Sequence, residues 1–215
     1  MGFRQSITGK KLSRMLRREQ RVSPSNVPVE VEEMRVTTAK RLSHIDKFVI
    51  RVGKFDKSQP VKFLDVGCCP MLDGAPTTLS TKKAFRQAGY AIDITAVDKF
   101  FPKDFQPTDS KVNYASMDIS RSAPKGKFDL VRASKIFEHI KGAENVRRAK
   151  ENVFNAVNEG GLLVIDSLGK VVPEFGHKVR SGAGFVILKK VNGEMVFVKY
   201  IDPQSAYRSK RLGHI

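Results

Sequence analysis

The sequence predicts an α/β domain whose sheet is mostly parallel, ends in an antiparallel hairpin and has helices on both faces. Short apolar segments alternate with helical segments between residues 61 and 166, a pattern typical of βαβ units. The apolar segments are nearly continuous, as in strands that are buried on both faces. Near the end of the chain, two further strand-like segments flank Asn192-Gly193, a strong signal for a hairpin turn.

The elements follow in order along one domain of residues 29–215, after a basic extension over residues 1–28. Apolar residues at helical spacing predict a first helix over residues 31–52. Thr77 or Thr78 is the expected N-cap of the second helix, and Glu159-Gly160-Gly161 the expected end of the third. The predicted core over residues 61–166 and the hairpin over residues 184–201 then comprise strand Val61–Val66, helix Thr77–Ala88, strands Ile92–Val97, Val112–Ala115 and Phe128–Ala133, helix Ala143–Val157, strand Leu162–Asp166, and strands Gly184–Lys189 and Glu194–Ile201.

The 215-residue chain has a net charge of +17, which favours polyanionic partners such as nucleic acid or an anionic membrane surface. Most of the excess lies in the flanks, residues 1–60 and 167–215, whereas the middle of the chain is nearly balanced. The basic flanks therefore keep nucleic acid open as a partner, but the charge does not describe the core.

The two cysteines, Cys68 and Cys69, are neighbours, which excludes a secreted disulfide framework. The spacing of Cys and His predicts no metal site, and no apolar run approaches the length of a membrane span. A cytoplasmic setting is the expectation.

A carboxylate stands at the end of each of the first three predicted strands. Asp65 precedes the glycine turn at Gly67, where the backbone can approach a ligand closely. Asp98 ends the second strand, where a carboxylate can accept hydrogen bonds from both hydroxyls of a ribose. Asp118 follows the third strand, beside Ile119, and can accept a hydrogen bond from an adenine amino group. Ligands of open α/β sheets bind at this edge, although an Asp at a strand end is also a common turn former.

At these residues the sequence resembles the class I S-adenosylmethionine-dependent methyltransferases. The resemblance covers about residues 61–166. It rests on five motifs along the chain: FLDVGCCP, AVDKF, SMDI, FDLVRASKIFEHI and EGGLLVID. It implies a Rossmann-like seven-stranded sheet in which the antiparallel seventh strand is inserted beside the fifth, and S-adenosylmethionine as the cofactor.

The resemblance also implies roles for single residues. Asp65 and Gly67 would contact the methionine end of the cofactor, Asp98 would hold the ribose, and Asp118 with Ile119 would flank the adenine. The predicted cofactor site is completed by the residues that adjoin these positions and by the end of the fourth strand near the sulfonium: Cys68, Cys69, Lys99, Arg132 and Ala133.

Two alternatives to a methyltransferase follow from the first loop, the segment after Gly67 that leads into the second helix. Cys69 and Met71 stand where the methyltransferase family commonly has glycines, which leaves a non-catalytic cofactor-binding or RNA-binding protein on a degenerate fold as an alternative. A nicotinamide dehydrogenase is the weaker competitor, because the later glycines of G-x-G-x-x-G are replaced by Cys69 and Leu72.

His139, which follows the fourth strand, is the predicted general base if the acceptor must lose a proton, and Glu138 is the second candidate. A structural role for both residues in the connection to the next helix is the competing interpretation. The acceptor itself is open: the FEHI run is similar to that of small-molecule methyltransferases, whereas the basic flanks favour RNA.

Overall fold

The computed structural model describes residues 44–68, 75–102, 104–107, 109–134, 136–166 and 184–201. The predicted basic extension over residues 1–28 and the first part of the predicted helix over residues 31–52 lie outside these ranges; residues 44–53 are helical as predicted. None of the helices in the described ranges has both the length and the apolar character that crossing a membrane requires.

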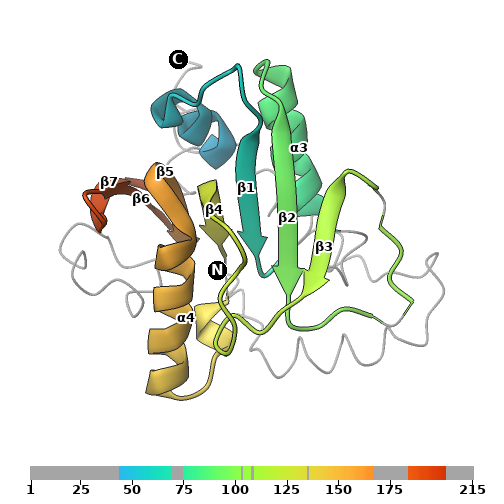
Figure 1. Cartoon of the computed structure of the whole chain (residues 1–215), viewed down its shortest axis with the longest axis vertical. Helices are drawn as coiled ribbons and strands as arrows, with labels where there is room; N and C mark the ends of the chain where they lie inside the picture. The colour runs from blue at the N-terminus through green and yellow to red at the C-terminus, as the bar shows by residue number, and fades with distance from the viewer. Residues whose placement is uncertain are drawn as a thin grey trace, which may run out of the picture. The chain divides into compact units, whose positions relative to one another are not determined.

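The described strands form one sheet in the order β3-β2-β1-β4-β5-β6-β7 (Figure 1). β1 to β5 pair with one another in parallel, whereas β6 pairs antiparallel with both β5 and β7. This confirms the predicted α/β class and the antiparallel hairpin. After the helix of residues 44–53, the elements are β1 (Val61–Val66), α3 (Pro76–Gln87), β2 (Ile92–Asp98), β3 (Val112–Ser116), β4 (Phe128–Ala133), the 3₁₀ helix η2 (Phe137–His139), α4 (Ala143–Ala156), β5 (Val157–Asp166), β6 (Phe185–Val191) and β7 (Glu194–Ile201).

The order of the last two strands differs from the one that the resemblance implies. β6, not the seventh strand, lies beside β5, and β7 lies at the edge of the sheet. The two strands are joined by a tight turn, in which Asn192 and Gly193 both have positive φ, 53° and 82°, as a two-residue hairpin turn requires. The Glu159 carboxylate accepts the main-chain N–H groups of both turn residues, at 2.6 and 3.1 Å, and so ties the hairpin to the start of β5.

β5 begins earlier than the sequence predicts, at Val157 instead of Leu162. Phe128 of β4 pairs with Val157, but Leu130 pairs with Leu162, so residues 158–161 form a bulge in β5. Gly160, with φ of 76°, supplies the turn inside this bulge. The predicted glycine turn is therefore present, but it lies within the strand and not before it.

One face of the sheet packs against α4. Leu64, Val131 and Leu163 lie side by side on β1, β4 and β5. They are buried against Ala149 and Val153 of the helix. Each aliphatic side chain buried in this way contributes about 1.5–3 kcal/mol. The cluster fixes α4 beneath the carboxyl ends of β4 and β5.

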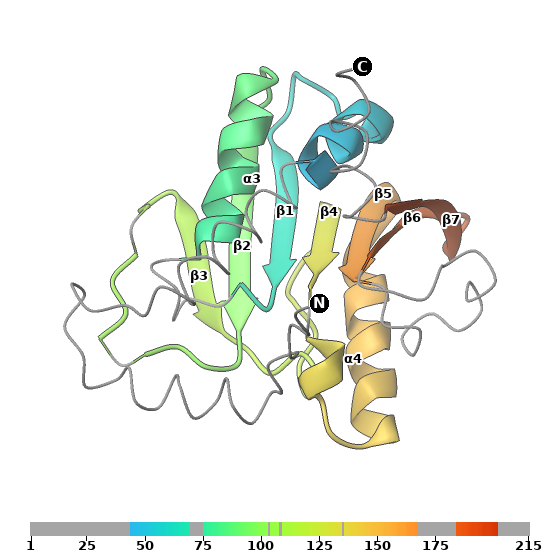
Figure 2. The same ribbon diagram turned by 180° about the vertical axis from the view of Figure 1, so that it is seen from behind.

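The other face packs against α3 and the helix of residues 44–53. Phe63, Leu130 and Val164 lie in this core with Phe85 of α3 and Val49 of the first helix. Figure 2 shows α3 running alongside β1 and β2 on this side. The face also buries charged side chains, which are described below.

The N-terminus of α3 differs from the prediction. Ala75 is the N-cap, with a φ of 60°, and Pro76 takes the first helical position, where its missing N–H has no cost. Neither Thr77 nor Thr78 caps the helix. The hydroxyl of Thr78 donates instead to the carboxylate of Asp65, across the gap between α3 and β1.

Candidate functional site

Three loops meet at the carboxyl edge of the sheet, toward which the arrows of β1, β2, β3 and β4 point in Figure 1. The main-chain N–H groups of Gly67 and Cys68 donate to the carbonyl oxygen of Val97, at 2.8 and 3.3 Å. The N–H of Met117 donates to the carbonyl oxygen of Asp98 at 2.8 Å. The segments that follow β1, β2 and β3 are therefore joined by main-chain hydrogen bonds at one edge.

Gly67 is required by its geometry. Its φ of 78° is strained for any other residue, and a Cβ there would collide with Cγ2 of Ile136. The chain after β4 consequently passes directly over the turn after β1. This contact places the first loop and the β4 loop side by side.

The side chain of Asp65 points away from the edge, into the interior between the sheet and α3. It is 2% exposed and accepts two hydrogen bonds from Arg132: Nε donates to Oδ1 at 2.9 Å and Nη2 to Oδ2 at 2.5 Å. The hydroxyl of Thr78 donates to Oδ2 at 2.5 Å. Arg132 is 3% exposed, and its guanidinium lies 5.2 Å from the centre of the Phe63 ring. The pair is a bidentate ion pair inside the core.

A second buried carboxylate extends this network to the helix of residues 44–53. Nη1 of Arg132 donates to the hydroxyl of Thr81 at 2.7 Å, and that hydroxyl lies 3.1 and 3.2 Å from the two oxygens of Asp46. Burial raises the pKa of Asp46 to about 6, although Arg132 and Thr81 oppose the rise. Burial alone would lower the pKa of Arg132, but Asp65 holds it above its ordinary value.

Asp98 has a different environment. It is half-buried, and its Oδ1 accepts the main-chain N–H of Phe100 at 3.0 Å. The ring of Phe100 is 65% exposed, and Nζ of Lys99 lies 5.4 Å from its centre. An acidic group and a large exposed aromatic ring thus stand together at the end of β2.

The Asp118 carboxylate organises the turn after β3. Its Oδ1 accepts the hydroxyl of Ser120 at 2.6 Å and the N–H of the same residue at 3.0 Å. Nζ of Lys99 lies 3.0 Å from Oδ2, and Nε of Arg121 lies 3.7 Å from it. The Ser120 hydrogen bond and Lys99 lower the pKa of Asp118 to about 2, so the group is ionised at neutral pH.

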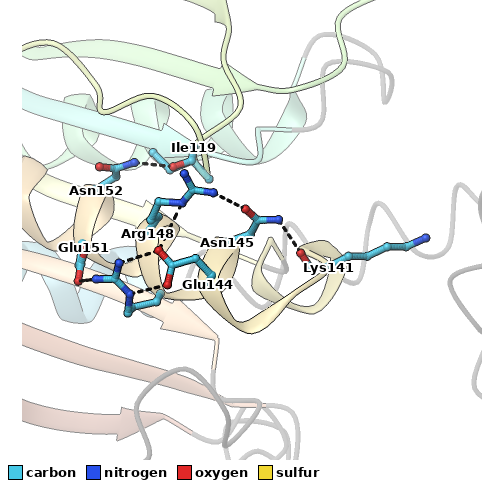
Figure 3. Close-up of polar contacts among 8 residues, drawn as sticks. Ile119, Lys141, Glu144, Asn145, Arg148, Glu151 and Asn152 are labelled. Atoms are coloured by element: carbon cyan, nitrogen blue, oxygen red, sulfur yellow. Dashed lines mark hydrogen bonds and ion pairs between the residues drawn. The ribbon is translucent and has the colours of Figure 1, made fainter.

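Ile119, the next residue, is held from the opposite side. Nδ2 of Asn152 on α4 donates to the carbonyl oxygen of Ile119 at 2.8 Å (Figure 3). The side chain of Ile119 is buried against the core. The turn is thus held by Lys99 on one side and by α4 on the other, with the Ile119 side chain packed in the core.

The exposed cations of α4 are paired within the helix. Arg147 binds Glu144 and Glu151 through the close ion pairs drawn in Figure 3. Arg148 donates to Oδ1 of Asn145 at 2.7 Å and lies 3.8 Å from Glu144. Such exposed pairs contribute little to the stability of the helix, because solvent screens them. They also neutralise charge that would otherwise attract phosphates.

Glu138 and His139 lie in η2, immediately after β4. Nε2 of His139 is 3.4 Å from Oε1 of Glu138, and the imidazole side chain is 58% exposed. Both side chains are therefore reachable from solvent near the carboxyl edge. Neither belongs to the buried network of the neighbouring Arg132.

The remaining predicted site residues fall in two groups. Ala133 and Cys68 are buried, the first in the core that packs on α4 and the second, 1% exposed, in the core that packs on α3. Cys69 lies outside the described residues. The structure thus brings Gly67, Asp98 and Ile119 to one edge, while the side chains of several other predicted residues lie inside.

Sequence reasoning missed Asp46, Thr78, Thr81 and Phe100. Thr78 and Thr81 bind the charged pair at the ends of β1 and β4, and Asp46 binds Thr81. No spacing pattern links the three residues, because they lie on two helices and meet only after folding. Phe100 had a signal: it is an aromatic residue two positions after a strand-end carboxylate.

A cavity of about 260 Å³ lies at the opposite edge, among the amino ends of β1, β4 and β5. Its lining includes Asp56, Asp129 and Glu159. Each of these carboxylates accepts main-chain N–H groups, from Ser58, from Lys62 and from the β6–β7 turn respectively. Their contacts are those of turn and strand ends.

Comparisons with known proteins give a likeness in shape. No protein-family model matches the chain, and no curated protein does. Among solved structures, the N-methyltransferase NodS from Bradyrhizobium japonicum WM9, in complex with S-adenosyl-L-homocysteine, is 22% identical, with a TM-score of 0.44 over 75% of this chain and 74% of that one. The magnesium protoporphyrin IX methyltransferase from Synechocystis PCC 6803 is 13% identical, with a TM-score of 0.45 over 80% and 75%. Similarity of this level assigns neither a family nor an activity to the chain.

Proposed function

We propose that this chain is an S-adenosylmethionine-dependent methyltransferase that acts on a small-molecule acceptor. The supporting observation is the joining of three loops at the carboxyl edge, where Gly67, Asp98 and the Asp118-Ile119 turn follow three adjacent strands. In open α/β sheets, ligands bind at this edge, where the strand order reverses. Here the order reverses between β1 and β4.

The residues at this edge suit an adenosine-type cofactor. Asp98 would accept hydrogen bonds from the ribose hydroxyls, because its carboxylate is half-buried and lies beside the edge. The exposed ring of Phe100 offers apolar surface for an adenine. Gly67 lets the chain after β4 pack against the turn after β1, and so shapes the edge at which the methionine end would lie.

The bound cofactor would supply a methyl group that its sulfonium charge already activates. The work of the chain is then to bind, to orient the acceptor and to exclude water. His139 would take a proton from an acceptor that must lose one, since its imidazole is exposed next to the end of β4. Glu138, 3.4 Å away, would orient that imidazole.

A small acceptor is favoured by the charges around the edge. Arg147, Arg148 and Lys99 are each engaged with a carboxylate of the same fold. A phosphate backbone would have to compete with these carboxylates. Much of the basic flanks lies outside the described residues, so RNA as the acceptor stays a prediction of the sequence.

Calorimetric titration with S-adenosylhomocysteine tests the cofactor site. Asp98→Asn is expected to weaken binding about 10- to 100-fold, because hydrogen bonds to an ionised group are lost. Asp93→Asn is the matched control, since Asp93 is exposed on the same strand far from the edge, and it is expected to bind as the parent does. Equal binding by the parent and Asp98→Asn would refute the assignment of the ribose site.

A labelled-methyl assay on a metabolite extract, beside one on whole-cell RNA, tests the acceptor. Label in the metabolite fraction that disappears with Asp98→Asn supports a small molecule. Label in RNA would overturn that choice. Cofactor binding with no labelled product in either fraction would favour the non-catalytic alternative.

A further inference from the structure

The carboxylate of Asp65 is fully surrounded by donors from its own fold. Arg132 contacts both oxygens and Thr78 contacts the second, with the carboxylate 2% exposed. A cofactor group that approached Asp65 would have to displace at least one of these donors. Removing a buried charged partner is strongly unfavourable, because it leaves the other charge buried and uncompensated. The side chain is therefore committed to the interior.

The buried pair lies directly beneath the first loop. Asp65 and Arg132 are paired in register on β1 and β4, two residues before Gly67 and Ser134. Those two positions are in contact above it, because the space beside Gly67 is closed by Ile136 and by the carbonyl oxygen of Ser134. Thr78 links the pair to the first turn of α3, the helix that follows the first loop in the chain. Both ends of the first loop are thus attached to the same carboxylate.

From this geometry we infer that Asp65, Arg132 and Thr78 are positioning residues, which hold the Gly67 turn and the start of α3 in the relative positions that binding requires, without touching the cofactor. The identity of the ligand rests on the proposed function. The structural role of the three residues does not depend on it. It assigns Asp65 a role different from the direct methionine contact that the sequence resemblance implies.

Asp46 and Thr81 continue the same arrangement to the helix of residues 44–53. The Thr81 hydroxyl accepts from Arg132, so its hydrogen is left for Asp46 or for the main-chain carbonyl of Thr77. One guanidinium is thereby oriented by two carboxylates from different elements. The helix of residues 44–53 is in this way linked to the loop at the carboxyl edge.

Thr78→Val and Thr78→Ser test the positioning role. Valine keeps the shape of the side chain and removes the donor, whereas serine keeps the hydroxyl. Thr77→Val is the matched control, because Thr77 enters the network only through its main-chain carbonyl oxygen. Circular dichroism and thermal unfolding first establish that each variant is folded at the assay temperature.

Two readouts separate the inference from the proposed function. The first is the rate at which iodoacetamide alkylates Cys68 in a Cys69→Ser background, where Cys68 is the remaining cysteine of the two in the chain. Cys68 follows Gly67 in the turn and is 1% exposed, so its alkylation reports opening of that turn without any cofactor. The second is the calorimetric dissociation constant of S-adenosylhomocysteine.

Thr78→Val is expected to speed alkylation and to weaken binding, each about tenfold, as the loss of one hydrogen bond to a charged group implies. Thr78→Ser and Thr77→Val should match the parent in both. Thr78→Val with parental alkylation and binding would overturn the inference, as would faster alkylation with unchanged binding. If the parent itself binds no S-adenosylhomocysteine while Thr78→Val still speeds alkylation, the hold on the loop stands and the proposed function fails.

Discussion

Asp65 and Asp98 each stand near the end of a parallel strand in the same sheet, yet they have opposite surroundings. Asp65 is enclosed by Arg132 and Thr78 between the sheet and α3. Asp98 is half-buried at the edge and accepts the N–H of Phe100, its own neighbour in the chain. The first carboxylate joins elements far apart in the sequence, whereas the second shapes a local turn. An acidic residue near a strand end therefore has two different uses, and sequence position does not distinguish them.

The cause lies in register and in the alternation of side chains. Asp65 is one residue before the end of β1 and pairs with Ala96 and Arg132, so its side chain points into a covered face. Asp98 is the last residue of β2 and lies one step beyond the last β1–β2 pair, Val66 with Val97. Its side chain therefore lies beyond the end of β1.

Asp65→Asn is the substitution with the largest expected effect. It leaves the buried guanidinium of Arg132 without a charged partner, which destabilises the fold by about 3–5 kcal/mol. Asp98→Asn should change the free energy of unfolding by less than about 1 kcal/mol, because it alters one local turn. Urea unfolding of the two variants measures the difference.

The double variant Asp65→Leu with Arg132→Met is the control for that prediction. Replacing both charges with apolar groups removes the unpaired ion and should recover part of the lost stability. Equal destabilisation by Asp65→Asn and Asp98→Asn would contradict the contrast between the two carboxylates.

Asp46 gives the next largest effect, through pH. Its folded-state pKa of about 6 lies above the ordinary value of 3.8, so between these values the folded chain binds more protons than the unfolded chain. The contribution of Asp46 to stability is therefore greatest at low pH and is lost as pH rises from about 4 to 6, by on the order of 3 kcal/mol. Asp46→Asn removes the titrating group but keeps an acceptor for Thr81.

Urea midpoints of the parent and Asp46→Asn at pH 4, 5, 6 and 7 check this sign. The stability of the parent, relative to the variant, should decline across this range and level off above pH 6. Parallel curves would show that Asp46 does not titrate in the folded state as its burial implies.

Much of the fold was predictable from the sequence, because it depends on local patterns. The apolar runs gave the bounds of β1, β4 and β7 correctly, and Asn192-Gly193 located the hairpin. The strand beside β5 was not predictable from local pattern, because two antiparallel strands joined by a tight turn can be placed in either order at an edge.

The predicted site separated into a part that the sequence could show and a part that it could not. The positions of Gly67 and Asp98 at the edge follow from where their strands end. The burial of Arg132 does not, since an arginine at a strand end is ordinarily exposed, and the partners that keep it inside, Asp65 of β1 and Thr81 of α3, lie at other places in the chain. Whether the edge residues bind the cofactor stays a prediction.

The smaller of the two pH effects is expected at Asp118, and it has the sign opposite to that of Asp46. Ser120 and Lys99 lower the pKa of Asp118 to about 2, below its ordinary value of 3.8, so the ionised form stabilises the fold. That contribution is present above about pH 4 and is lost as pH falls toward 2; since the partner Lys99 is largely exposed, about 1 kcal/mol is expected. Asp118→Asn should therefore cost about that amount at pH 7 and nothing near pH 2. Thermal unfolding of both proteins at pH 7, 4, 3 and 2 measures it, and a deficit that persists unchanged at pH 2 would mean that the Ser120 hydrogen bonds, not the charge, fix this turn.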